Sequence, residues 1–535
     1  MTAPLLAALA LALAAAAGPA AATPADTIRL YDNLGTHHHA ISTKVPLAQQ
    51  YFGQGLRLTY AFNHAEAIRA FEEAARLDPD CAVCWWGVAL AYGPNINAPM
   101  DSAGGVAAWA ALEKAQALAD KASGAERDYI AALAKRYAAG APPARAALDS
   151  AYASAMADLA SRHPDDLDAA TLAAEAAMDL RPWNYWTPAG EPQPGTAELV
   201  AQLEGVIGRN PDHPGACHFY IHAVEAVAPE NAVPCAERLA GLMPGAGHIV
   251  HMPAHIYIRV GRYGDAIDAN IHAVHTDETF IADQAPSGIY PGFYYPHNLH
   301  FLGLVSMLSG RGQAAIDAAR QAAARMPVEI ARAVPDAAAF LAYPHLTLMT
   351  FGRWEDVLAE PWPPDDITLA AGQVHYARGV AFAATGRVAE AQAELTAVQQ
   401  AAAALTDGWP ATALQIANHA LQGEIAARQG RHEEAIGHLQ AAAALEDGLP
   451  YTEPPYWHRP VRHTLGAVLL DAGRAAEAEA VYREDLARFP ENGWALFGLA
   501  ASLEAQGQSD EAAAVRARYA VAWNGADVTL TASRF

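Results

Sequence analysis

Histidine is the residue type in this chain with the strongest potential for metal chemistry, and it is concentrated in one region. Ten of the 22 histidines lie between residues 213 and 300, where an even spread would place about four. Six of them form pairs at a spacing of three or four residues: His218 with His222, His251 with His255, and His297 with His300. Residues at this spacing share a helix face, so each pair presents two imidazoles together. Since imidazole binds Zn, Cu, Fe and Ni, the pattern predicts a transition-metal site.

Several other residues extend this predicted site. Glu225 follows His222 by three residues and can serve as a carboxylate ligand or orient an imidazole. His248, and the run of His37, His38 and His39 on an N-terminal arm that folds back, are further candidate ligands with weaker support. Pro253 lies between His251 and His255, so a helix that begins there would leave His251 outside it.

A second interpretation of the histidines stays open. A single histidine in a helix is usually structural, and the same side chains can line a groove and form hydrogen bonds with a peptide or with one another. If the histidines do bind a metal, an all-nitrogen site in an exported protein favours copper or zinc over iron.

Two aromatic loops flank the histidine-rich region. They are "LRPWNYWTPAGEPQPG", residues 180–195, and "SGIYPGFYYPHNLH", residues 287–300, both interrupted by Pro and Gly. Six of their side chains are candidates for the walls of a substrate pocket: Trp183, Tyr185, Trp186, Tyr290, Tyr294 and Tyr295. The alternative is that they fill gaps between irregular repeats.

The four cysteines form two pairs. Cys81 and Cys84 make a CxxC at a predicted helix start, and they are a candidate disulfide in an oxidising compartment. No βαβ pattern surrounds them, which disfavours a redox motif. Cys217 and Cys235 lie on successive predicted helices, where the geometry of a disulfide is doubtful.

A repeated helix-turn-helix pattern must position all of these residues. It begins with "FNHAEAIRAFEEAARLDP" and recurs as "GRYGDAIDANIHAV" from Gly261 and "GRGQAAIDAARQAA" from Gly310. Further copies start at Gly352, Gly386, Gly430 and Gly473, and in each copy a turn glycine is followed by arginine and then by a helical apolar pattern. The pattern resembles the tetratricopeptide repeat family, most clearly over residues 47–92 and 248–520.

The resemblance implies an all-α solenoid, a right-handed superhelix of paired helices. The first helix of each pair would line a concave groove, which in this family commonly binds a peptide or a protein segment. His251 and His300 each lie ten residues before a turn glycine. This register would place both on the groove side, so the three histidine pairs are expected to converge there.

Composition limits the partners. The net charge is −24, with 34 Lys and Arg against 58 Asp and Glu, so an acidic surface disfavours nucleic acid and anionic membranes. No G-x-S-x-G, P-loop or H-E-x-x-H motif occurs, and the sequence does not decide whether the protein is an enzyme.

The N-terminus predicts export. An apolar run from Leu5 to Ala17 precedes a Gly-Pro break and small residues that fit a cleavage site, and it is too short to span a membrane. In a bacterium the destination would be the periplasm. The predicted organisation is a signal peptide at 1–22, a histidine-containing arm at 23–46, irregular repeats at 47–212, the histidine-rich repeats at 213–325, and regular repeats at 326–535.

Two functions remain open from the sequence alone. In the first, a concave groove carries a transition-metal site for metal binding or for metal-assisted chemistry on a small substrate. In the second, the protein is an adaptor whose groove holds a peptide or protein partner without metal.

Overall fold

The computed structural model describes residues 28–139, 144–286 and 288–535. The predicted signal peptide lies outside the described residues. Within them the regular structure is helical, and the β pairing printed is two isolated bridges, Asn95 with Ala98 and Trp186 with Pro192. The predicted all-α fold of paired helices is therefore confirmed.

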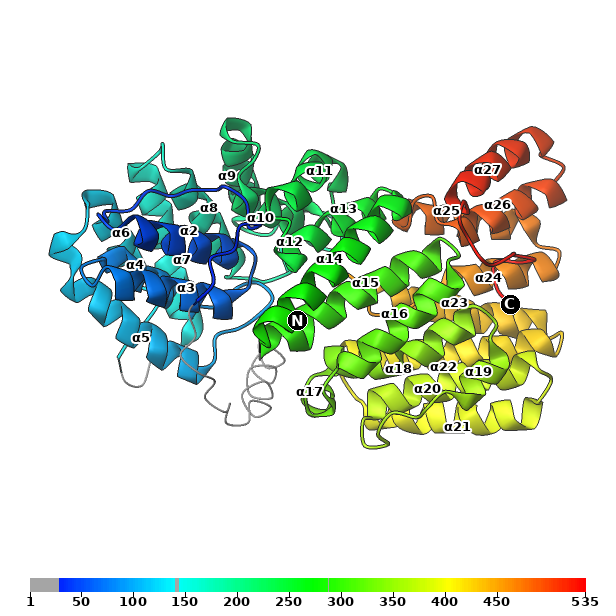
Figure 1. Cartoon of the computed structure of the whole chain (residues 1–535). Helices are drawn as coiled ribbons and strands as arrows, with labels where there is room; N and C mark the ends of the chain where they lie inside the picture. The colour runs from blue at the N-terminus through cyan, green and yellow to red at the C-terminus, as the bar shows by residue number, and fades with distance from the viewer. Residues whose placement is uncertain (1–27, 140–143, 287) are drawn as a thin grey trace. The chain divides into compact units, whose positions relative to one another are not determined.

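The chain forms two compact units (Figure 1). The first contains residues 1–256 and 272–290, and the second contains residues 257–271 and 291–535. The division falls inside the segment 213–325 that the sequence analysis set apart. The five-part organisation from the sequence is finer than this division and stays a prediction.

The first unit is built from helices that pack against their neighbours in the chain. Their bounds are α2 Pro46–Tyr60, α3 His64–Leu77, α4 Ala82–Ala91, α5 Ser102–Ala117, η1 Ala119–Lys121, α6 Gly124–Leu133, α7 Arg145–Arg162, α8 Leu167–Met178, α9 Thr196–Arg209, α10 Pro214–Val224, η2 Pro229–Ala232, α11 Val233–Leu242 and α12 Gly247–His251. Two further helices contribute residues to both units, α13 Pro253–Arg259 and α14 Tyr263–Gln284.

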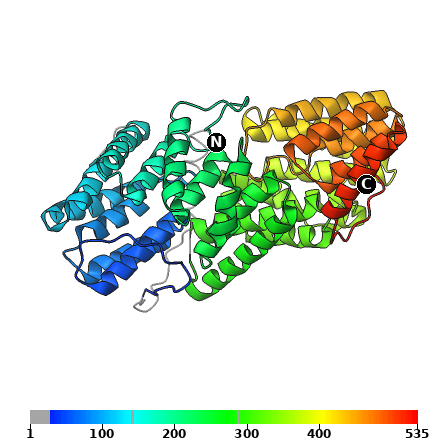
Figure 2. The same cartoon turned by 90° about the horizontal axis from the view of Figure 1, so that it is seen from above.

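The second unit continues the pairing. Its helices are α15 Tyr295–Leu308, α16 Gly312–Arg325, α17 Val328–Ala333, α18 Pro335–Thr350, α19 Trp354–Ala359, α20 Thr368–Ala384, α21 Val388–Ala404, α22 Gly408–Arg428, α23 His432–Asp447, α24 Val461–Asp471, α25 Ala475–Arg488, α26 Gly493–Ala505 and α27 Ser509–Ala522; a π-helical turn, η3 Tyr290–Tyr294, precedes α15. Figure 2 shows the helices of this unit lying side by side, from green through yellow to red.

The turn glycines of the repeats have the left-handed conformation that ends a helix. Their φ angles lie between 65° and 77° at Gly261, Gly310, Gly352, Gly386, Gly430 and Gly473. The amide of the next residue, an arginine in each case, donates to a carbonyl five residues earlier, as in Arg262 to Tyr257 at 2.8 Å and Arg474 to Leu469 at 2.8 Å. This is the Schellman motif, which needs a residue that tolerates positive φ. The repeated Gly-Arg pairs in the sequence therefore mark helix ends.

Small residues allow the paired helices to approach closely. A Cβ added to Gly55 on α2 would lie 2.7 Å from the ring of Phe71 on α3, and one added to Gly87 on α4 would lie 2.5 Å from the same ring. The ring of Phe71 is fully buried between these glycines. The aromatic and small residues of the repeat pattern are thus matched across the helix pair.

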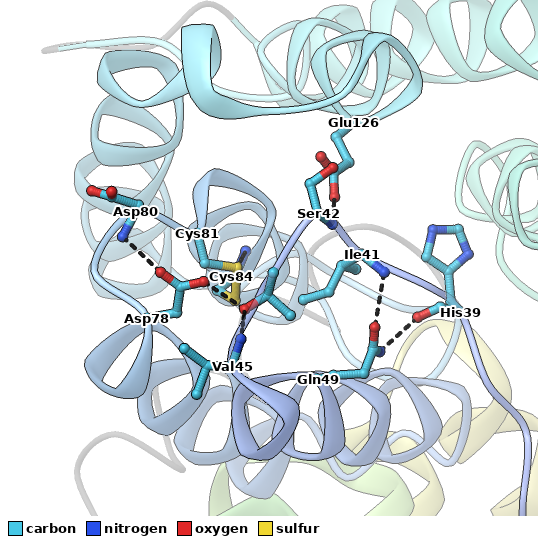
Figure 3. The surroundings of a disulfide bond; sticks show 11 residues. His39, Ile41, Ser42, Val45, Gln49, Asp78, Asp80, Cys81, Cys84 and Glu126 are labelled. Atoms are coloured by element: carbon cyan, nitrogen blue, oxygen red, sulfur yellow. Dashed lines mark hydrogen bonds between the residues drawn. A yellow bond between two sulfur atoms is a disulfide. The ribbon is translucent and has the colours of Figure 1, made fainter.

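The single disulfide among the described residues joins Cys81 to Cys84 at the start of α4 (Figure 3). The Sγ of Cys81 also accepts the Cys84 amide at 3.2 Å, which caps the helix. Cys217 and Cys235 are free thiols, and both are buried. A hydrogen bond with the thiol of Cys235, together with burial, raises the pKa of Cys217, so the Cys217 thiol is not poised to react as a thiolate at neutral pH.

A segment after α27 packs back onto the second unit. The Tyr482 hydroxyl and Ser533 Oγ are 2.6 Å apart, and Ser533 donates to the carbonyl of His463 at 2.7 Å. Arg534 forms an ion pair with Glu424 at 2.6 Å, and both side chains are buried. The residues that this segment contacts lie on α22, α24 and α25. None of the helices in the described ranges is long and apolar enough to cross a membrane.

Candidate metal centre

Five imidazoles and one carboxylate gather in the interior of the first unit. They come from the α10 region, from α12 and from α13, and none is more than 3% exposed. We call this group the Glu225 cluster; it consists of His218, His222, Glu225, His248, His251 and His255. Two of the three predicted histidine pairs belong to it, together with His248, a candidate with weaker support from the spacing of the histidines.

Glu225 orients two of the imidazoles. Its Oε2 lies 2.6 Å from Nδ1 of His255, and its Oε1 lies 3.3 Å from Nδ1 of His222. A third imidazole is fixed by the backbone, since Nδ1 of His218 donates to the carbonyl of Tyr60 at 2.6 Å. Each of these three rings therefore carries its proton on Nδ1 and keeps the Nε2 lone pair. Carboxylate and carbonyl partners of this kind fix the tautomer of metal-binding histidines.

The available Nε2 atoms lie within reach of one another. Those of His218 and His222 are buried and have no hydrogen-bond partner among the described residues. His218, His222 and His248 each offer a ring nitrogen within 4.8 Å of the others, and Nε2 of His251 lies 2.9 Å from Nε2 of His255. Two nitrogens bound to one Zn²⁺ at about 2.0–2.1 Å are at most about 4.2 Å apart, so small shifts would complete a shared site.

The pKa shifts of His218, His222 and Glu225 favour the protonation states that bind a cation. Burial, and the nearby His222, hold the pKa of His218 well below its usual value, so the ring is neutral at pH 7. Burial also lowers the pKa of His222, although Glu225 opposes that effect. Burial alone would raise the pKa of Glu225, but His255 and His222 outweigh it and bring it to about 2. The neutral imidazoles of His218 and His222 and the ionised carboxylate of Glu225 are the protonation states that a metal needs.

The helix that carries the second pair is interrupted, as the proline had indicated. α12 ends at His251 and α13 begins at Pro253, with Met252 between them. Met252 keeps helical dihedral angles, φ −50° and ψ −35°, so the turn is nearly continuous. The rings of His251 and His255 consequently still meet, with centroids 4.8 Å apart.

Two residues with strained backbones pack against the cluster. Phe62 and Trp183 have φ angles of 57° and 65°, which bulky side chains rarely adopt. The Phe62 ring lies 4.5 Å from His218 and 5.6 Å from His248, and the Trp183 ring lies 5.0 Å from His222. Such strain is maintained only where surrounding contacts enforce it, and it concentrates at functional sites.

The other aromatic residues of the two loops are divided between the units. In the first unit Tyr185 is buried, the Trp186 indole donates to the Ala223 carbonyl at 2.7 Å, and the Tyr290 hydroxyl donates to Asp277 at 2.8 Å. Tyr294 and Tyr295 are buried in the second unit. The Tyr290 hydroxyl also accepts the amide of His248 at 3.3 Å, and the role of these aromatic side chains as walls of a substrate pocket stays a prediction.

The third histidine pair belongs to the second unit. His297 on α15 packs 5.2 Å from Phe301, and His300 packs 4.4 Å from Tyr343. Burial lowers the pKa of His300 to about 3. The expectation that these two residues join the other pairs stays a prediction.

The histidine run of the N-terminal arm surrounds a different carboxylate. Asp168 on α8 lies 2.9 Å from His37, 2.8 Å from His39 and 3.2 Å from His213. We call His37, His39, His213, Asp166 and Asp168 the Asp168 cluster. Asp166 and Asp168 carry no signal in the sequence, because they are about 130 residues from the arm and no spacing links them to it.

Comparisons with known proteins bear on the fold alone. The sequence matches no protein-family model and no curated protein. Among solved structures, yeast Tom70 is 13% identical with a TM-score of 0.29, and the match covers 90% of this chain and 92% of that chain. The human IFIT1 dimer with m7Gppp-AAAA is 12% identical with a TM-score of 0.34, covering 90% of this chain and 91% of that chain.

The class of protein follows from the helices and the cluster together. The helix pairs with their Schellman turns make this a tetratricopeptide-like helical-repeat protein. Its first unit contains a buried group of imidazoles with the composition and spacing to hold a metal ion.

Proposed function

We propose that this protein binds a transition-metal ion in the Glu225 cluster, copper or zinc in preference to other metals. The observation that carries the proposal is the pair of buried Nε2 atoms on His218 and His222, which have no hydrogen-bond partner in the described part of the chain. Leaving two buried acceptors unsatisfied costs about 1–3 kcal/mol each, a cost that a bound ion would remove.

The donor set supports the choice of metal. His218, His222 and His248 offer nitrogen atoms to one ion, and His251 and His255 lie next to them. Imidazole nitrogens suit copper and zinc, whereas magnesium, calcium and manganese prefer oxygen. Phe62 and Trp183 shield the rings from water, which favours tight retention of the ion.

Burial of the cluster favours metal binding or storage over turnover of a bulky substrate. Metal-assisted chemistry on a small substrate would require movement of the aromatic side chains that cover the rings. We also propose that the protein is exported, on the strength of its N-terminal apolar run and its Cys81–Cys84 disulfide, a bond that persists in oxidising compartments.

Elemental analysis of protein purified without an affinity tag tests the metal proposal. We expect stoichiometric copper or zinc in the parent protein, and a loss of at least about tenfold in affinity in a His218→Ala/His222→Ala variant. His272→Ala is the matched control, because His272 lies in the same unit on α14 and is exposed. A metal-free parent protein after growth and refolding with both metals would refute the proposal.

An adaptor that binds a peptide is the second candidate, since it is the usual role of the repeat family that the sequence resembles. One observation weighs against it in the second unit. In that unit α22 and α24 are the first helices of their pairs. They already contact the segment after α27, because Glu424 on α22 binds Arg534 and the His463 carbonyl on α24 accepts from Ser533. A peptide partner would have to displace Ser533 and Arg534 from these sites.

A further inference from the structure

The N-terminal arm is held in place on α2 at several points (Figure 3). The Gln49 side chain donates to the carbonyl of His39 at 2.9 Å and accepts the amide of Ile41 at 2.9 Å. Arg57 donates to the carbonyl of His37 at 2.7 Å. The backbone that carries the histidines is thus fixed by α2, independently of what their rings contact.

Two alternate histidines of the arm, His37 and His39, contact the same carboxylate, that of Asp168. His37 and His39 are half-buried and both contact Asp168, whereas His38 between them is exposed. The Tyr60 hydroxyl donates to the same carboxylate at 2.5 Å.

The tautomer of His213 makes it an orienting group for Asp168 and not a ligand. Nδ1 of His213 accepts the Ala216 amide at 3.1 Å as the N-cap of α10, so in the neutral ring Nε2 carries the proton. That Nε2 donates to Asp168 Oδ1 and orients it. Oδ1 also receives Tyr60 and His37, which leaves Oδ2, with His39 Nδ1 at 2.8 Å, as the less crowded side.

A second carboxylate completes a set of donors on that side. His39, Asp166 and Asp168 each offer a ligand atom within 4.8 Å of the others. The two oxygens of Asp166 accept the Ala169 amide and the Tyr129 hydroxyl, so this side chain is also held in position. Neither aspartate forms an ion pair with Lys or Arg among the described residues.

We propose that His39, Asp166 and Asp168 bind a second, exchangeable divalent cation of the Mn²⁺ class. This site is separate from the Glu225 cluster and does not depend on it. One imidazole and two carboxylates form a harder donor set than five imidazoles, and carboxylates suit Mn²⁺. Tyr60, His37, His213 and Tyr129 are positioning residues that hold the two carboxylates through hydrogen bonds.

The surroundings of the site leave coordination positions open. A cavity of about 560 Å³ adjoins the cluster, and its lining includes all three proposed ligands together with His38, Asp165 and Asp212. No lysine or arginine is among the lining residues. This polar, acidic cavity admits water or an oxygen ligand of a small molecule to the cation and disfavours a free anion.

Titration of the metal-depleted full-length protein with Mn²⁺ tests the proposal, with electron paramagnetic resonance measuring free Mn²⁺. We expect one bound Mn²⁺ in the parent protein and in His38→Ala, and at least about tenfold weaker binding in His39→Ala. Asp166→Asn is a second variant, because an amide oxygen can still cap α8 in a folded protein. The His218→Ala/His222→Ala variant should bind Mn²⁺ as the parent does.

Three outcomes would overturn this site. The first is a parent protein that binds no Mn²⁺, which would leave the histidines as a network of hydrogen bonds around Asp168. The second is unchanged Mn²⁺ binding in both His39→Ala and Asp166→Asn. The third is loss of Mn²⁺ from the His218→Ala/His222→Ala variant, which would place the ion in the Glu225 cluster. None of these results changes the copper or zinc content that tests the proposed function.

Discussion

Glu225 and Asp168 are two buried carboxylates of the first unit that organise histidines in opposite ways. Glu225 contacts the Nδ1 atoms of His222 and His255, and the remaining Nε2 atoms face further imidazoles. Asp168 receives four donors and lies beside a cavity. The same carboxylate–imidazole contact therefore occurs in a buried cluster with one carboxylate and five imidazoles, and in a cluster beside a cavity with two carboxylates and three imidazoles.

One residue outside both clusters, Tyr60, forms a hydrogen bond with each of them. The Tyr60 hydroxyl donates to Asp168, and the Tyr60 carbonyl accepts from His218 of the Glu225 cluster. Tyr60 is the last residue of α2, and Phe62, with its strained φ of 57°, follows two residues later. The turn between α2 and α3 thus positions groups in both clusters at once, through the backbone on one side and a side chain on the other.

Removal of the Glu225 carboxylate should have the largest effect. Glu225→Ala leaves the buried Nδ1–H groups of His222 and His255 without their acceptor, so we expect the metal-free protein to lose about 1–3 kcal/mol of stability for each of the two donors. Metal affinity should fall by about 10–100-fold. Chemical denaturation with and without metal measures both. A variant as stable as the parent would show that Glu225 does not organise the cluster, and His272→Ala supplies the baseline.

Much of the Glu225 cluster was predictable from local spacing. His218 and His222 lie one helical turn apart, and so do His251 and His255, because Met252 keeps helical dihedral angles at the break before Pro253. The Gly-Arg pairs likewise marked the helix ends, because the Schellman turn requires positive φ at one residue. Periodicity within a helix and turn chemistry are local properties, so a sequence reveals them.

The Asp168 cluster could not be predicted in this way. The arm and α8 are separated in the chain by α2 to α7, and no sequence motif links them. The contact of His248 with His218 is likewise not visible in the sequence, because His248 lies outside the i, i+4 pairs and reaches His218 through packing, with ring centroids 4.9 Å apart. Contacts between distant segments depend on the whole fold.

Tyr60→Phe should separate the two clusters with an effect of intermediate size. The substitution removes the hydroxyl that Asp168 accepts but keeps the carbonyl that His218 uses. A hydrogen bond to a charged group contributes about 1.5–3 kcal/mol, so Mn²⁺ affinity should fall by about tenfold or more. Copper or zinc content should not change. Equal losses at both sites would instead mean that the α2–α3 turn itself had been disturbed.

The smallest predicted effect concerns His458, an imidazole without a carboxylate partner among the described residues. His458 in the second unit is 8% exposed, and neither ring nitrogen has a hydrogen-bond partner among the described residues. Burial, with the charge of Arg459, lowers its pKa to about 3. Between about pH 6.5 and 3 the unfolded chain therefore binds a proton that the folded chain does not, and stability falls as the pH falls.

His458→Phe removes that proton while keeping a buried ring beside Trp457, whose centroid lies 4.9 Å away. We expect the pH dependence of the free energy of unfolding to become shallower by up to about 1.4 kcal/mol per pH unit below pH 6.5. Denaturation series from pH 7 to about pH 4 measure this slope, with His272→Ala as the exposed control. An unchanged slope would mean that His458 is protonated in the folded state, and the contrast with the carboxylate-paired histidines would then lose its basis.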